Sequence, residues 1–332
     1  MNILCTGGAG YVGSACVRYL LQRGHQVTVY DNLSAGSECA VPDPGERLVR
    51  GDIRDPERLS RVIKERSIDA VMHFAALISV SESVEQPADY WEVNFVGTKC
   101  LLDVLRACDV KRVVFSSTAA VYAPNDGEPL VESSTTRPVN PYGDTKLAAE
   151  RLLAGYREAY GLGFRTLRYF NASGADVSGE FGEDRAKESH LIPLALQAAI
   201  GKRPSLSVFG NDWGTRDGTC VRDYVHVSDI AQAHALCLET LEPGTGATYN
   251  LGNSHGTSVL EVIAACERVS GRSLPWAFSP RRAGDPATLV ASSARIREDL
   301  GWSPDYADIA AIVESAHRWH QRYPGGYADK GT

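Results

Sequence analysis

Two side chains suited to proton transfer, Tyr142 and Lys146, stand four positions apart in the stretch Tyr142-Gly143-Asp144-Thr145-Lys146. On a helix this spacing places both side chains on one face. A phenol with a pKa of about 10 is a poor base at neutral pH, and nearby positive charge is what stabilises its phenolate. We therefore expect Lys146 to support Tyr142 as a general base toward a hydroxyl group.

A third candidate for this chemistry is Thr118, which closes the hydroxyl-rich run Ser116-Ser117-Thr118 at the end of an apolar, strand-like segment. Active sites of parallel sheets gather at the carboxyl ends of the strands. Thr118 is expected to hydrogen-bond the reacting oxygen and to share its proton with Tyr142.

A glycine-rich turn, Gly7-Gly8-Ala9-Gly10-Tyr11-Val12-Gly13, follows the apolar run Asn2 to Thr6 and precedes a helical pattern. Gly7, Gly10 and Gly13 permit a tight turn, close approach of a pyrophosphate to the backbone, and close packing of the helix on the strand. Asp31 ends the second strand, where its carboxylate can accept from both ribose hydroxyls and would repel a 2′-phosphate. The pattern favours NAD over NADP, and the positive nicotinamide would further stabilise the phenolate.

These residues need a scaffold of alternating strands and helices. Strands are expected at 2–6, 26–30, 47–49, 69–74, 112–116 and 164–169, and helices at 11–23, 56–66, 88–108 and 142–160. This alternation predicts an α/β fold with a Rossmann-type, doubly wound parallel sheet. After residue 171 the chain becomes rich in Gly, Asp and Ser, with helices expected near 190–201, 227–241 and 257–270. We expect this part to pack over the ends of the sheet and to carry substrate specificity.

Composition narrows the class of protein. The 332 residues hold 34 Lys and Arg against 41 Asp and Glu, without a basic block, which argues against nucleic-acid and anionic-membrane surfaces. The eight cysteines form no C-x-x-C pair and no Cys/His ligand spacing, so we expect reduced thiols and no metal. The N-terminus carries no signal-peptide pattern and no stretch approaches 18 apolar residues, so a cytoplasmic enzyme is expected.

Longer motifs resemble those of the extended short-chain dehydrogenase/reductases and, within them, the UDP-glucose (UDP-galactose) 4-epimerase family along nearly the whole chain. They include YDNLS from Tyr30, GDIRD from Gly51, SSTAAVY from Ser116, NPYGDTKLAAE from Asn140, LRYFNASGA from Leu167, VFGNDWGTRDGTCVRDYVHVSD from Val208 and PRRAGDP from Pro280. The resemblance implies that bound NAD is not consumed. It implies that Tyr142 takes the proton of the sugar 4-OH while hydride leaves C4, and that the 4-keto sugar then turns so that hydride returns to its opposite face.

The same resemblance assigns further positions. Toward NAD it implies roles for Tyr11, Val12, Asn32, Asp52, Ile53, Phe74, Ala75, Ala76, Asn94 and Phe170. Asp52 and Ile53 would lie beside the adenine, whereas from the sequence alone Asn94, within the helix expected at 88–108, is a solvated side chain. Toward the UDP-sugar the resemblance implies roles for Asn171, His190, Leu191, Val208, Phe209, Arg222, Tyr224, Arg282, Asp285 and Leu289. Arg222 and Arg282 would meet the diphosphate, and Asp285 a ribose hydroxyl.

Three positions depart from the family pattern. Ile78 stands where many members have a lysine near the cofactor pyrophosphate, and His190 replaces a common asparagine. His190 can cap a helix or donate to the phosphates. Leu289 aligns with the position whose bulk limits the sugar pocket, and its intermediate size suggests that UDP-N-acetylhexosamines are also accepted.

The resemblance also implies a division of the chain and an assembly. Residues 1–170, with returning segments near 225–250, would form the NAD-binding domain, and 171–224 with 251–332 a smaller, mixed α/β UDP-sugar-binding domain. A homodimer through the helices expected at 88–108 and 142–160 is a family expectation.

Alternative functions differ in their sequence requirements. The nearest alternative within the fold is a nucleotide-sugar 4,6-dehydratase or decarboxylase. Relatives of the dehydratase place Asp-Glu after the catalytic threonine, whereas Ala119-Ala120 follow Thr118 here. A 4-epimerase of UDP-pentoses (xylose or arabinose) or UDP-hexuronates shares the catalytic groups and stays open. A non-catalytic NAD-binding sensor would typically lack Tyr142 or Lys146.

Overall fold

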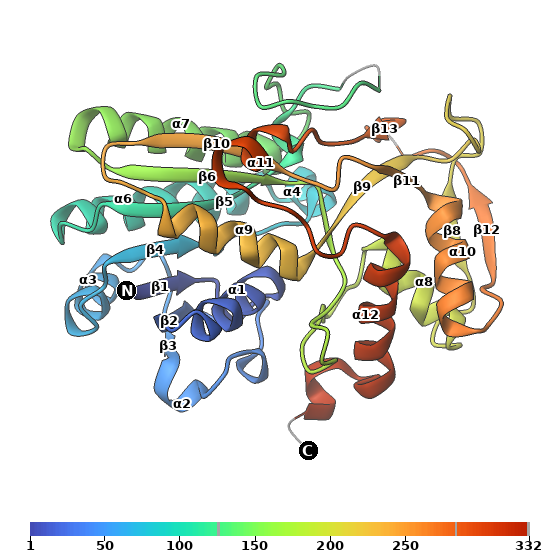
Figure 1. The fold of residues 1–332 in the computed structure, drawn as a ribbon, viewed down its shortest axis with the longest axis horizontal. Coiled ribbons are helices and arrows are strands. Elements are labelled where there is room, and N and C mark those ends of the chain that lie inside the picture. The colour runs from blue at the N-terminus through green and yellow to red at the C-terminus, as the bar shows by residue number, and fades with distance from the viewer. Residues whose placement is uncertain (125–126, 283, 331–332) are drawn as a thin grey trace.

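The largest element of the computed structural model, which describes residues 1–124, 127–282 and 284–330, is a seven-stranded parallel sheet (Figure 1). Its order is β10-β6-β5-β4-β1-β2-β3. The strands are β1 (Asn2–Thr6), β2 (Gln26–Asp31), β3 (Leu48–Arg50), β4 (Ala70–His73), β5 (Arg112–Thr118), β6 (Gly163–Tyr169) and β10 (Gly246–Leu251). Their apolar residues are buried because helices cover both faces, as expected of parallel sheets.

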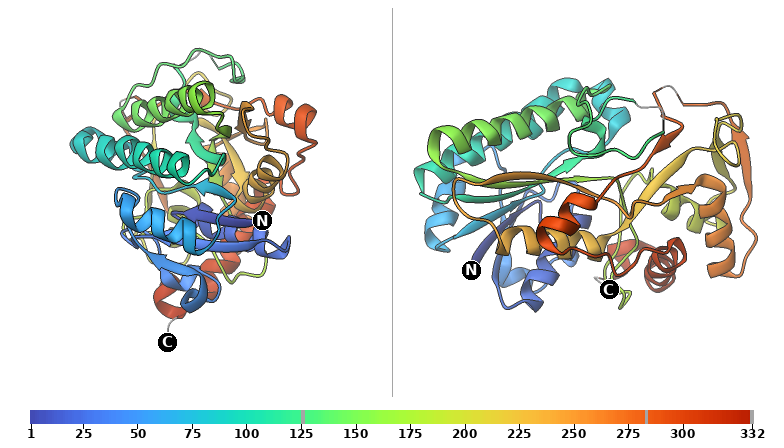
Figure 2. Two further views of the ribbon diagram at one scale, coloured as in Figure 1. Left: turned by 90° about the vertical axis from the view of Figure 1, so that its left-hand side faces the viewer. Right: turned by 45° about the horizontal axis from the view of Figure 1, so that its top comes forward.

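Two helix layers enclose this sheet (Figures 1 and 2). One face packs α1 (Tyr11–Gln22) and α9 (Val227–Glu239), and the other packs α3 (Pro56–Glu65), α6 (Gly97–Ala107) and α7 (Pro141–Tyr160). Each face has its own hydrophobic core. Since α9 and β10 come late in the chain, the segment from 227 to 251 returns to the sheet after the chain has left it.

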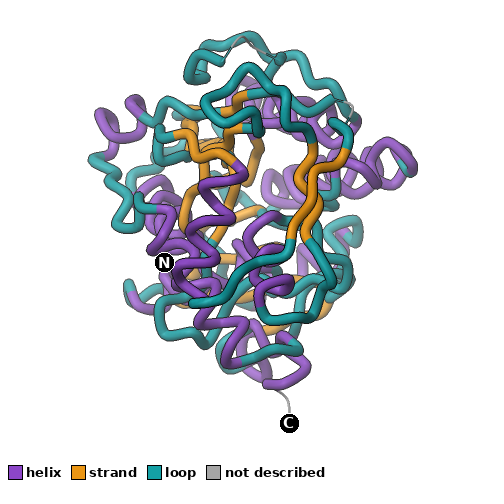
Figure 3. The backbone as a smooth tube through the Cα atoms, turned by 90° about the vertical axis from the view of Figure 1, so that its right-hand side faces the viewer, coloured by secondary structure: helices purple, strands orange, loops and turns teal. Residues whose placement is uncertain are grey.

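A second lobe adjoins the carboxyl ends of the strands. Its strands are β7 (Asn171–Ser173), β8 (Leu206–Phe209), β9 (Val221–His226), β11 (Gly256–Ser258), β12 (Trp276–Ser279) and β13 (Thr288–Leu289). Its helices are α8 (Leu191–Ala199), α10 (Val259–Ser270) and α12 (Ile309–Arg322). Figure 3, viewed from the side where this lobe lies, shows long loops between these elements. β6 leads through Phe170 directly into β7, so this lobe begins at the carboxyl end of β6.

The helix predicted over 88–108 is present from Pro87 to Ala107, but its middle is a π-helical segment that the sequence analysis did not predict. The chain there forms α5 (Pro87–Tyr90), a π-helical segment (Trp91–Val96) and α6. Such wider turns are frequent at functional sites. The solvated Asn94 that the sequence alone indicates is wrong, because Asn94 lies inside the π-helical segment and is buried.

Several elements escaped the sequence analysis: α2 (Pro44–Arg47), α4 (Val80–Glu85), α11 (Ala294–Leu300) and α12. The first three are short. In α12 the buried residues Ile312, Ala316 and Trp319 are spaced at helical intervals, so apolar periodicity could have identified it. None of the described helices combines the length and apolarity that a membrane span requires.

Candidate functional site

In the glycine turn between β1 and α1, two glycines lie too close to backbone atoms to carry a Cβ, and a third has room for one. A Cβ on Gly7, whose φ is +70°, would lie 2.4 Å from the Ala75 nitrogen, and one on Gly13 would lie 2.3 Å from the Gly7 carbonyl oxygen. A Cβ on Gly10 would meet that same oxygen only at 3.4 Å, an ordinary contact. Gly7 and Gly13 therefore hold the turn together, while Gly10 leaves its outer surface bare at the start of α1. The turn fits a dinucleotide pyrophosphate, which binds at such helix N-termini.

Asp31, at the end of β2, ties this turn to the sheet. Its Oδ2 accepts from the Ala9 backbone N–H at 3.0 Å, and its Oδ1 from the Leu33 N–H at 2.8 Å. Burial raises the pKa of this carboxyl above its ordinary value. Each carboxylate oxygen can accept more than one hydrogen bond, so Asp31 retains capacity for the ribose hydroxyls.

The other positions predicted to contact NAD follow the ends of β2 to β4. The Asp52 carboxylate accepts from the Arg54 guanidinium at 2.7 and 2.8 Å, which holds its pKa low, at about 2. Asn32 Nδ2 donates to it at 3.3 Å. The Phe74 ring packs 4.8 Å from the His234 ring, while the backbone of Ala75 closes on Gly7. These residues lie together on one edge of the sheet, and their contacts to NAD stay predictions, as do those of Tyr11, Val12, Ile53 and Ala76.

Asn94 has protein partners for its polar atoms. Its Oδ1 accepts from the Leu77 N–H at 2.8 Å, and its Nδ2 donates to the Leu77 carbonyl at 2.9 Å and to Thr145 Oγ1 at 3.2 Å. It thus joins the segment after β4 to the helix that carries Tyr142 and Lys146. This segment also contains Ile78, whose side chain is exposed.

Tyr142 stands in the first turn of α7, and local sequence fixes it there. Asn140 caps the helix by accepting from the Gly143 N–H at 2.9 Å, with Pro141 as the first helical residue. A Cβ on Gly143 would lie 2.3 Å from the Ala120 carbonyl oxygen, so only glycine allows the turn after β5 to approach this closely. The approach brings Thr118 to Tyr142. Burial raises the pKa of the Tyr142 phenol, and its hydrogen bond with Thr118 lowers it.

Lys146 lies one turn further along the same face of α7. Its Nζ donates to the Ser116 carbonyl at 3.0 Å and stands 5.0 Å from the centre of the Phe115 ring. The side chain is almost fully buried, and burial lowers its pKa to about 7, against the opposing charge of Glu150. The structure therefore brings Thr118, Tyr142 and Lys146 together, as predicted.

Two charged groups near this centre were missed from the sequence. Arg185 contributes a positive charge that lowers the pKa of Tyr142. Glu150, four residues after Lys146, is buried and ion-paired with Arg168 at 2.6 Å. The helical spacing from Lys146 was a signal for Glu150, whereas nothing in the loop sequence around Arg185 indicated its place.

The second lobe gathers the residues predicted to hold the diphosphate. Arg222 on β9 and Arg282 meet at Asp285, with N–O distances of 3.7 and 2.9 Å. The Arg282 guanidinium lies 4.7 Å from the centre of the Phe209 ring. The Arg282 side chain is 58% exposed and the Arg222 side chain 13%, so the pair combines an anchored cation with an accessible one.

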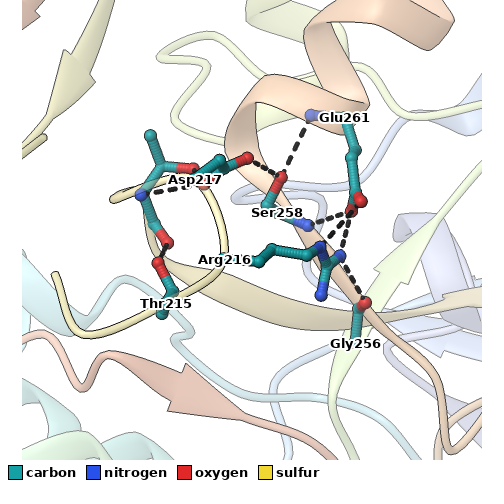
Figure 4. A network of polar contacts seen from close by, with 7 residues as sticks. Thr215, Arg216, Asp217, Gly256, Ser258 and Glu261 are labelled. Carbon is teal, nitrogen blue, oxygen red and sulfur yellow. Dashed lines mark hydrogen bonds and ion pairs between the residues drawn. The ribbon is translucent and has the colours of Figure 1, made fainter.

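The loop before β9 is fastened to the start of α10 (Figure 4). Asp217 accepts from the Thr219 N–H at 2.9 Å and from the Ser258 hydroxyl, while Ser258 caps α10 in a capping box with Glu261. Arg216 pairs with Glu261 and donates to the Gly256 carbonyl at 2.9 Å. This anchoring fixes the strand on which Arg222 lies.

Leu289 connects the two lobes. It lies beside Arg222 in the β9–β13 register and packs on a cluster that contains Ala119, Leu147 and Phe170. Leu289, the predicted specificity position, thus adjoins both the turn after β5 and the strand that carries Arg222.

The remaining substrate-side predictions have mixed surroundings. His190 occupies the N-cap position of α8 without a side-chain cap bond, and its Nδ1 lies 2.7 Å from the buried Glu183 carboxylate. Tyr224 and Val208 are buried in the core of the second lobe. Asn171 and Leu191 are partly exposed. The ligand contacts of all these side chains stay predictions.

Comparison with known proteins identifies the family of this chain. A family model described as the NAD dependent epimerase/dehydratase family matches residues 3–252. A Halalkalibacterium halodurans protein named UDP-glucose 4-epimerase is 50% identical over 329 residues, covering 99% of this chain and 98% of that protein. A crystal structure of a UDP-glucose 4-epimerase matches with a TM-score of 0.95 and 45% identity over 98% of this chain and 99% of that one. The Brucella ovis UDP-glucose 4-epimerase in complex with NAD gives a TM-score of 0.91 and 45% identity over 96% and 98%. This chain therefore belongs to the NAD dependent epimerase/dehydratase family.

Proposed function

We propose that this protein is an NAD-dependent UDP-glucose 4-epimerase, which interconverts UDP-galactose and UDP-glucose by inverting C4 of the hexose. The observation that carries the proposal is the meeting of Thr118, Tyr142 and Lys146 at the end of β5, on the sheet edge that also bears the glycine turn. Relatives with this name match nearly the whole chain. Residues 1–170 and 225–250 would hold NAD, and 171–224 with 251–332 the UDP-sugar.

The protein groups divide the work at C4. NAD, when bound, supplies a group that accepts hydride from C4 of the hexose and later returns it to the opposite face of the same carbon. Tyr142 removes the proton of the 4-hydroxyl and later gives it back. Thr118, hydrogen-bonded to Tyr142, orients the reacting oxygen, and the Lys146 cation stabilises the phenolate.

Inversion requires the 4-keto sugar to turn between the two transfers while the nucleotide stays bound. Arg222 and Arg282 would hold the diphosphate through charge-assisted hydrogen bonds. With Asp285 between them, their positions are set before substrate arrives. Binding is therefore concentrated on the nucleotide, and the hexose keeps its freedom to rotate.

The replacement Tyr142→Phe tests the proposal. The buried ring keeps its edge contact with Tyr90 at 6.4 Å, so the fold and NAD binding should survive. Loss of a general base should lower the rate of UDP-galactose epimerisation about 10²- to 10⁴-fold. Tyr160→Phe, on the exposed end of the same helix, is the control and should leave the rate unchanged. Full activity of Tyr142→Phe, or turnover of UDP-xylose but not UDP-galactose by the unaltered protein, would contradict the proposal.

We also propose a homodimer and a reducing, cytoplasmic location. Val84, Trp91 and Val96 are exposed apolar side chains near α6 and α7, which supports association through this face. All eight cysteines are described, and each is a free thiol. Sedimentation of the purified protein should give twice the monomer mass, and Val84→Glu should shift it toward the monomer.

A further inference from the structure

Three successive residues at the end of β5 each contact one residue on the same face of α7. Thr118 hydrogen-bonds Tyr142, and the Ser116 carbonyl accepts from Lys146 at 3.0 Å. The Ser117 hydroxyl donates to Glu150 Oε1 at 2.5 Å. The helix positions 142, 146 and 150 are spaced by four, so they lie in one row. Two of the three helix residues are already assigned to the chemistry, and the third, Glu150, is not.

Glu150 is also held by an arginine on β6. Its two oxygens accept from Arg168 Nε at 3.0 Å and Nη2 at 2.6 Å, in a bidentate pair that is buried on both sides. Arg168 lies on β6, directly opposite Ser117 of β5 in the strand register. Its Nη1 donates to the Tyr122 hydroxyl at 2.8 Å, which donates to Asn250 Oδ1 at 2.7 Å. Strands β5, β6 and β10 are thereby joined to one carboxylate.

Burial opposes the charge of Lys146, and Glu150 favours it. Removal from water lowers the pKa of Lys146 to about 7, and the negative charge of Glu150 acts in the opposite direction. Lys146 in turn contributes, after burial, to the lowered pKa of His73. The ionisable groups packed around Lys146 and Glu150 are Tyr142 on α7, His73 on β4, Arg168 on β6 and Tyr122 in the turn after β5. Glu150 is therefore the neighbouring charge that opposes the effect of burial on Lys146.

We propose that Glu150 is a positioning residue for the base Tyr142: its carboxylate, fixed by Arg168, holds the end of β5 against α7 through the Ser117 hydroxyl and places a negative charge one helical turn from Lys146. The effect on catalysis rests on the proposed function, whereas the effect on Lys146 does not. A purely structural ion pair would add stability without changing when Lys146 loses its proton.

The test compares Glu150→Gln, Glu150→Asp and the control Glu158→Gln, which makes the same change at an exposed position of α7. The proton loss of Lys146 is followed in the NAD-loaded protein by trace acetic anhydride labelling across pH, with the Lys146 peptide quantified by mass spectrometry. Glu150→Gln should shift the midpoint downward by about one pH unit or more, equivalent to about a tenfold change in the equilibrium. Glu150→Asp retains the charge and should stay near the original midpoint even if its melting temperature falls. Glu158→Gln should change neither.

The pH profile of kcat/KM for UDP-galactose is measured on the same three proteins. Of these, only Glu150→Gln should shift the midpoint of its basic limb to lower pH, together with its labelling midpoint. If that variant does not fold because Arg168 is left unpaired, Glu150→Gln with Arg168→Met removes both charges. Its midpoint should still move downward, but by less than in Glu150→Gln, because the Arg168 cation is lost as well. An unshifted midpoint in whichever of these proteins folds would overturn the proposal. Failure of the unaltered protein to convert UDP-galactose would instead refute the proposed function, and the labelling would still decide the role of Glu150.

Discussion

Gly10 and Gly13 lie three residues apart, yet replacing each by alanine should have opposite consequences. A Cβ on Gly13 would lie 2.3 Å from the Gly7 oxygen and 2.8 Å from the Gly8 Cα, so the start of α1 must shift by about 1 Å to reach ordinary contact. Overpacking costs about 1–3 kcal/mol, and a 2.3 Å approach to a backbone oxygen places this case at about 2–3 kcal/mol, offset by about 1 kcal/mol of helix propensity. Gly13→Ala should therefore lower the free energy of unfolding by about 1–2 kcal/mol.

Gly10→Ala should leave the free energy of unfolding nearly unchanged and weaken NAD binding. Gly10 has φ −81° and ψ 175°, which alanine adopts freely, and its Cβ would meet no backbone closer than 3.4 Å. Loss of a favourable N-cap residue and reduced freedom of the unfolded chain are each worth about 0.5–1 kcal/mol and nearly cancel. The added methyl group would stand where the pyrophosphate approaches, so NAD affinity should fall at least about tenfold, or about 1.4 kcal/mol.

Urea unfolding of cofactor-free protein gives the stabilities, and titration with NAD gives the affinities. Gly155→Ala is the control, because a Cβ at this position inside α7 meets no described atom within 4 Å. It should stabilise the protein by about 0.5–1 kcal/mol and leave NAD binding unchanged. Unaltered NAD affinity in Gly10→Ala, or unaltered stability in Gly13→Ala, would refute the assignment of the turn.

Three further predictions concern specificity, the diphosphate and pH. Leu289→Tyr should lower turnover of UDP-N-acetylglucosamine about 10- to 100-fold relative to UDP-glucose, and equal losses on both substrates would contradict a pocket limit at this position. Arg282→Leu should raise KM for UDP-galactose about tenfold with little change in melting temperature, because the side chain is largely exposed; an unchanged KM would remove Arg282 from the site. Burial lowers the pKa of His73 and of His234 from 6.5 to about 3, so the unfolded chain binds more protons below pH 6.5. The contribution of each to stability should be constant above that pH and should fall by up to about 1.4 kcal/mol per pH unit between about 6.5 and 3. Urea midpoints from pH 7.5 to 4.5 check this decline, which His73→Gln should make shallower; an identical slope in the variant would count against it.

The parts of the fold predicted well are those encoded by local pattern. Apolar runs flanked by helical periodicity located six of the seven strands of the sheet, and Asn2–Thr6 was predicted to the residue. The seventh, β10 (Gly246–Leu251), was not predicted. The helix over 88–108 was predicted, but its π-helical segment Trp91–Val96 was not, because tertiary contacts such as those of Asn94, rather than residue propensity, favour it. Periodicity cannot distinguish the two kinds of turn.

The grouping of Thr118, Tyr142 and Lys146 was predictable because Tyr142 and Lys146 share one helix and Thr118 ends the neighbouring strand. Contacts that depend on how distant segments fold were not. The resemblance implied a diphosphate contact for Arg222 and Arg282 and a ribose contact for Asp285, whereas the ion pairs that join the three residues needed coordinates.

The most direct test of C4 inversion through bound NAD uses UDP-galactose carrying deuterium at C4, incubated with purified protein in ordinary water without added NAD. The expected product is UDP-glucose with the deuterium still at C4, because a hydride held on the protein does not exchange with solvent. Loss of the deuterium, an absolute need for added NAD in every turnover, or a product altered at another carbon would contradict the proposed reaction.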